Sequence, residues 1–60
     1  MTKLYRFIIE FCMPWDESPN CQRIFGCNAP TFDDAIKRLK SDWPDAIVDS
    51  VTNTGEVRFV

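Results

Sequence analysis

The chain has 60 residues, of which 45% are hydrophobic and 13% aromatic, and its nine acidic and seven basic side chains give a net charge of −2. This length predicts a single domain, residues 1–60, with a small core. The composition excludes a disordered chain, since disordered segments are poor in aromatic and β-branched residues. The acidic balance also argues against direct nucleic-acid binding, which usually depends on a concentrated positive charge.

Neither a membrane span nor a secretory signal is indicated. No uninterrupted apolar run is longer than Phe7 to Ile9, whereas a bilayer span needs about 20 apolar residues. The first residues lack the basic start and apolar middle of a secretory signal. We therefore expect a cytoplasmic protein without a membrane partner. In that compartment Cys12, Cys21 and Cys27, an odd number, are expected to be reduced thiols.

The first half of the chain predicts a hairpin. Residues 3–12 alternate with the period of a β-strand, and one face of this strand is formed by Tyr5, Phe7, Ile9 and Phe11. Residues 13–20 contain two prolines and several turn-forming residues, which predicts a long loop. Residues 21–27 form a weaker second strand, in which Gly26 predicts a bulge.

One helix is predicted between Thr31 and Pro44. Thr31 is a suitable N-cap, and Asp34 three residues later completes a short capping box. An apolar stripe with helical spacing consists of Phe32, Ala35, Ile36, Leu39 and Trp43. Because Pro44 disfavours helical geometry at the preceding residue, the helix should end near Asp42. The helical register of Trp43 predicts that its side chain belongs to the core.

The remaining residues predict two more strands, 46–52 and 56–60, joined by a short hairpin loop at 53–55. The element order is therefore β-β-α-β-β. This is an α+β fold, in which one helix packs on one face of a small antiparallel sheet. The other face of the sheet should remain open.

Catalysis, metal binding and cofactor binding are not expected. The chain contains no histidine, which is the commonest general base near neutral pH. The spacing of the three cysteines matches no zinc-binding pattern, and no glycine-rich phosphate loop is present. Adjacent acids such as Asp33 and Asp34 are best explained as an exposed helix N-terminus.

The loop at residues 13–17 is the best candidate for a contact surface. Met13, Pro14 and Trp15 are consecutive, and Asp16 and Glu17 follow. Tryptophan is enriched at binding hot spots, so Trp15 would be an aromatic anchor beside the charged rim of Asp16 and Glu17. An alternative is that Trp15 folds back and fills an open end of the small core.

Two weaker contact candidates, Arg6 and Glu10, lie on the second face of strand 3–12, which is partly apolar rather than purely polar. A strand with such a face is either central in its sheet or in contact with another molecule. Arg6 and Glu10 would then contribute to binding from the open side of the sheet.

The segment from Ala29 to Ile36, which leads to Trp43-Pro44 and two closing strands, resembles small phage-encoded host-interaction proteins, among them anti-CRISPR proteins. The resemblance covers the layout of most of the chain and includes no motif that identifies a member. It implies that the protein acts in the host cell cytoplasm by occupying a surface of a larger nuclease or nucleoprotein complex. No functional residue is transferred from it.

The sequence therefore favours a non-enzymatic protein that inhibits or modulates a larger partner by occluding its surface. One alternative is a single-strand nucleic-acid-binding module, in which basic residues surround an aromatic on the sheet. Its residues would be Arg6, Arg23, Lys37, Arg38, Lys40 and Tyr5. A second alternative is a structural subunit whose open apolar surface forms a homodimer.

Overall fold

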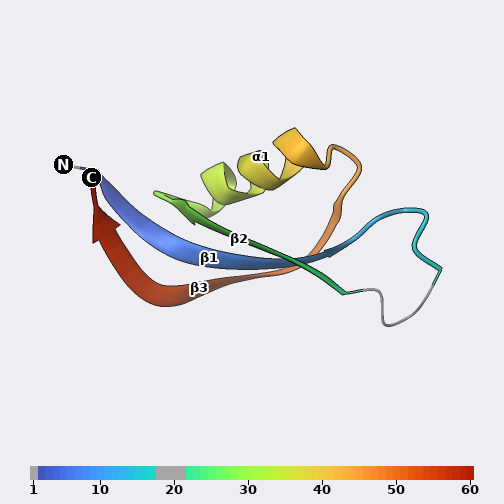
Figure 1. Ribbon diagram of the computed structural model, residues 1–60, viewed down its shortest axis with the longest axis horizontal. Helices are drawn as coiled ribbons and strands as arrows, with labels where there is room; N and C mark the ends of the chain where they lie inside the picture. The colour runs from blue at the N-terminus through green and yellow to red at the C-terminus, as the bar shows by residue number, and fades with distance from the viewer. Residues whose placement is uncertain (1, 18–21) are drawn as a thin grey trace.

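The computed structural model describes residues 2–17 and 22–60. Its elements are β1 (Lys3–Cys12), β2 (Arg23–Ala29), α1 (Phe32–Asp42) and β3 (Ile47–Phe59). The three strands form one antiparallel sheet in the order β2-β1-β3, and α1 lies along one face of it beside β2 (Figure 1). The predicted α+β class is confirmed, and so are the first strand, at residues 3–12, and the single helix.

The predicted β-β-α-β-β order is wrong, because the described residues form three strands and the two predicted C-terminal strands are one. β3 pairs with the whole of β1: Phe59 lies opposite Lys3, and Ile47 lies opposite Cys12. The physical reason is the length of β1, whose second edge carries backbone groups that all need hydrogen-bond partners. A continuous β3 supplies those partners along the full edge, whereas a hairpin would fold half of the segment away.

The predicted turn at residues 53–55 instead forms a bulge within β3. Tyr5 lies opposite Val57 and Phe7 opposite Asn53, so three residues of β3 stand against one of β1. Gly55 has a φ of 89°, and its N–H donates to the Asn53 side-chain oxygen at 2.9 Å. The turn-forming residues therefore bend the strand without reversing it, which Figure 1 shows as the curve in β3.

The second strand begins at Arg23 and extends to Ala29, two residues beyond the predicted end. Cys21, at the predicted start, lies outside the described residues. The bulge predicted at Gly26 is wrong, because β2 pairs with β1 in a continuous register that places Gly26 opposite Ile8. A side chain at position 26 would meet the Arg6 guanidinium, which lies 2.7 Å from the ideal Cβ position. The glycine thus makes room for Arg6.

The helix has the predicted boundaries. The Thr31 hydroxyl accepts a hydrogen bond from the Asp34 N–H at 3.2 Å, which caps the first turn. At the other end the Trp43 N–H donates to the Leu39 carbonyl at 2.8 Å, and Trp43 is the C-cap. Pro44 follows, so the helix ends where the sequence predicts.

The core lies between α1 and the sheet. It consists of Phe7, Ile9, Phe11, Met13, Cys27, Ala29, Ala35, Leu39 and Ala46. The expected core position of Trp43 is wrong, since its side chain remains 40% exposed. The helix ends at this residue, so its ring lies at the margin, with its centroid 6.4 Å from that of Phe11. Met13 fills this end of the core instead and is 3% exposed.

Candidate functional site

A closed turn at residues 13–16 carries the main candidate residue. The Asp16 N–H donates to the Met13 carbonyl at 3.0 Å, and the Met13 N–H donates to the Asp16 carboxylate at 2.8 Å. Pro14 occupies the second position of the turn, where its fixed φ is favourable. Because Met13 is anchored in the core, Trp15 is left at the surface and is 60% exposed. Trp15 therefore does not fill the core.

Arg23 holds this turn from the start of β2. Its Nε and Nη2 atoms each donate to one carboxylate oxygen of Asp16, both at 3.1 Å, in the two-pronged geometry that suits a guanidinium and a carboxylate. These hydrogen bonds and that from Met13 hold the pKa of Asp16 below its ordinary value. The Asp16 side chain is only 14% exposed, so it fixes the loop more than it offers a carboxylate to a partner.

Arg23 also connects the turn to the end of α1. Its guanidinium carbon lies 5.9 Å from the centroid of the Trp43 ring, within the range of a cation–π contact. We define the loop-end surface as Trp15, Glu17, Arg23 and Trp43. All four are exposed, and Figure 1 shows residues 13–17 and the connection from α1 to β3 on the same side of the molecule.

The open face of the sheet carries the two weaker candidates. The even-numbered residues of β1 alternate with its core residues and therefore face away from α1. On this face the Ser50 hydroxyl donates to the Glu10 carboxylate at 3.3 Å, and the Arg6 side chain lies over Gly26. The hydrogen bonds of Glu10 and of the turn, within residues 2–17 and 22–60, are made to different partners, so the predicted contact residues form two groups.

Sequence reasoning missed the roles of Arg23 and Trp43 at this site. From the sequence, Arg23 is expected only as a basic residue for nucleic acid, and Trp43 only as a core residue. The useful signal is the opposite charge of Asp16, within the predicted hairpin loop, and Arg23, in the predicted strand that follows the loop.

Cys27 is buried beneath α1, and this burial raises the pKa of its thiol despite the nearby Arg38 and Arg6. No group of three or more side chains that bind metals occurs in residues 2–17 and 22–60. In the same part of the chain, no helix has the length and apolar character needed to cross a bilayer. Comparison of the chain with protein-family models, curated proteins and solved structures found no match.

Proposed function

We propose that this protein is a non-enzymatic binding protein that occludes a surface of a larger partner, with the loop-end surface as its main contact. The observation that carries this proposal is the exposure of Trp15 at the tip of a turn whose ends are held by Asp16. A tryptophan in such a place is available to a partner without any rearrangement of the core.

The physical advantage of this arrangement is preorganisation. Ordering a flexible loop on binding costs conformational entropy, and a loop that is already closed avoids much of that cost. Here Arg23 restrains the turn from outside and Met13 from the core. Trp15 and Trp43 supply aromatic area of the kind that dominates binding hot spots, while Glu17 provides an exposed charge at the rim.

The proposed partner is a larger protein or nucleoprotein complex, as the resemblance to phage-encoded inhibitors implies. A net charge of −2 is compatible with competition for a basic surface that normally meets phosphate. The step of inhibition is then steric, and it requires no catalytic group in this chain.

Affinity measurements on variants test the proposal. A partner captured from a host lysate is purified, and its dissociation constant is measured with the wild type, Trp15→Ala and Phe59→Ala. Phe59 is a matched control because it is a 61% exposed aromatic at the other end of β3. Loss of a hot-spot tryptophan costs about 2 kcal/mol or more, which corresponds to at least about a thirtyfold weaker complex. Equal affinities for the wild type and Trp15→Ala would show that Trp15 does not contribute to partner binding.

Homodimer formation is a second candidate, favoured by exposed apolar side chains near the end of β3. Val57, Phe59 and Val60 are all exposed there, although the bulge before them bends this strand and makes edge-to-edge pairing less favourable. Sedimentation over a range of concentrations tests it, because a chain that stays monomeric at high concentration is not a dimerising subunit.

A further inference from the structure

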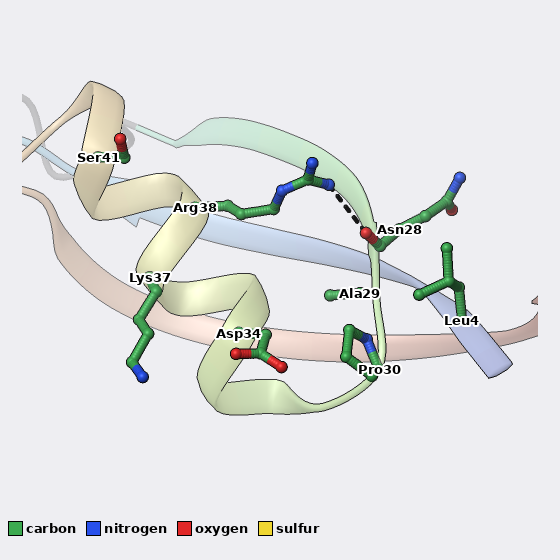
Figure 2. A pocket seen from close by; sticks show the side chains of 8 residues that line it. All are labelled: Leu4, Asn28, Ala29, Pro30, Asp34, Lys37, Arg38 and Ser41. Atoms are coloured by element: carbon green, nitrogen blue, oxygen red, sulfur yellow. Dashed lines mark hydrogen bonds between the residues drawn. The ribbon is translucent and has the colours of Figure 1, made fainter. Parts of the chain in front are cut away.

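A groove runs between α1 and the outer edge of β2. It consists of two neighbouring hollows that share Arg38 and Ser41 as lining residues. The larger has a volume of about 470 Å³ and extends past Asn28 to Leu4, near the start of β1. Figure 2 shows Arg38 reaching from α1 across this hollow toward β2. The smaller hollow lies beside Gly26.

The backbone of β2 presents hydrogen-bonding groups to this groove. In an antiparallel pair, the N–H and C=O of one residue point to the same side of the strand, and that side alternates along the chain. The Asn28 carbonyl accepts a hydrogen bond from Arg38 at 2.9 Å, so it points away from β1. Gly26 and Ile24, which are in phase with Asn28, therefore also direct their backbone groups outward.

These outward groups are available for another strand. The sheet order β2-β1-β3 leaves this edge of β2 unpaired by the described strands. Within residues 2–17 and 22–60, no side chain caps the outer groups of Gly26 or Ile24 as Arg38 caps Asn28. The stretch from Ile24 to Asn28 is about 13 Å long at the usual rise per residue, which is enough to pair with a short extended peptide.

Positive charge flanks this edge on both faces of the sheet. Arg38 and Lys37 line the groove on the helix side, and the Arg6 guanidinium lies over Gly26 on the open side. Arg6 and Arg38 are both close enough to Cys27, in the middle of β2, to lower its pKa against the effect of burial. Acidic side chains also lie nearby: Asp34 and Asp42 line the groove, and Glu10 lies opposite Ile24. The charged groups that act on Cys27, in the middle of β2, are nevertheless the two arginines.

We propose that this groove binds an extended acidic peptide segment of a partner protein, which adds to β2 as a fourth strand. Backbone hydrogen bonds to Gly26 and Ile24 hold the segment, in the mode by which peptides extend an exposed sheet edge. Successive side chains of a strand point to opposite faces. One set of acidic side chains therefore meets Arg38 and Lys37, and the alternate set meets Arg6. This site is separate from the loop-end surface and does not depend on the function proposed for it.

The test uses a fluorescent eight-residue peptide in which glutamate pairs alternate with valine pairs, so that glutamates face both sides of the added strand. Binding is followed by anisotropy at two salt concentrations and by the amide shifts of Gly26 and Ile24 in nuclear magnetic resonance spectra. We expect saturable binding that weakens with salt and moves both amide signals. Methylation of alternate backbone nitrogens in the peptide should weaken binding at least about tenfold, since it removes donors that pair with the edge.

Variants of the protein test which basic side chains contact the peptide. Arg38→Gln and Arg6→Gln should each weaken binding about threefold, the range expected for a partly exposed ion pair. Lys40→Gln is the matched control, because Lys40 is an exposed basic residue of α1 outside the groove lining, and it should bind as the wild type does. Trp15→Ala should also bind normally, which separates this site from the loop-end surface.

Four results would overturn the proposal, and three of them concern the acidic peptide: no binding, equal binding of its methylated form, or unchanged amide signals of Gly26 and Ile24. A single-stranded oligothymidine that binds as tightly and moves the same signals would also overturn it. That result would mean that the edge recognises negative charge alone.

Discussion

The guanidinium of Arg23 holds both carboxylate oxygens of Asp16, at 3.1 Å each, across a sequence separation of seven residues. The same guanidinium lies over the ring of Trp43. A single side chain therefore couples the loop after β1, the start of β2 and the end of α1. The exposed Trp15 is positioned by this coupling as much as by the turn that contains it.

Stability should depend on pH through Asp16. Its folded pKa lies below the ordinary value of 3.8, because Arg23 and the Met13 N–H stabilise the carboxylate. The contribution is therefore present above pH 3.8 and is lost as the pH falls through the lower, folded value. In urea titrations, wild type should exceed Asp16→Asn in unfolding midpoint at pH 7, and the two should converge in acid. The exposed Glu17 provides the control, and a Glu17→Gln variant that changed as much would contradict the assignment.

Truncation of Leu39 should leave a large fraction of the molecules unfolded. Leu39 is completely buried between α1 and the sheet, and Leu→Ala changes in cores cost about 2 to 5 kcal/mol. A core of this size supplies only about 3 to 5 kcal/mol in total. Circular dichroism should therefore show a large loss of structure in Leu39→Ala. Lys40→Ala, at the exposed neighbouring position, should remain folded, and a stable Leu39→Ala variant would contradict this account of the core.

The parts of the fold that the sequence predicts well are those determined by neighbouring residues. Thr31 caps the helix through a residue three positions away, and Pro44 ends it through its own geometry. The long β3 could not be predicted in this way, since the choice between a hairpin and a bulged strand depends on pairing between Phe7 and Asn53, far apart in sequence. Local turn preference is compatible with both outcomes.

The candidate site shows the same limit. Met13 and Trp15 are both apolar residues of one loop, and the sequence cannot decide which of them enters the core. That choice depends on Arg23, which reaches Asp16 from the far side of the loop and fixes the turn. The expected core position of Trp43 fails because helical periodicity does not hold at the helix end, where the backbone of Trp43 has φ −132° and ψ 75°.

Replacement of Gly55 should destabilise the bulge of β3. Its φ of 89° lies in the region that disfavours L side chains, and no heavy atom lies within 4 Å of the ideal Cβ position. The cost of Gly55→Ala is therefore conformational, about 1 to 2 kcal/mol. Gly55→Asn should cost less, because asparagine tolerates positive φ better. Denaturant titrations of both variants measure the difference. Equal stability of Gly55→Ala and the wild type would contradict the backbone geometry described for this bulge.

Of the two cysteines in residues 2–17 and 22–60, Cys27 should be the more slowly reacting thiol in the folded state. Its side chain is buried, and burial raises its pKa above the ordinary value of 9.0, so both access and thiolate formation are reduced. Alkylation followed by mass spectrometry should show labelling of Cys27 roughly a hundredfold slower in buffer than in urea, given a stability of about 3 kcal/mol. Cys12, which is half-buried on the open face, should react faster. If Cys27 were labelled in buffer as quickly as in urea, the packing of α1 over β2 would be wrong.

Stability should also depend on pH through Cys27. Because the pKa of Cys27 is higher in the folded state, stability should fall as the pH rises above 9.0. Replacement of Cys27 by serine should abolish this component of the decrease.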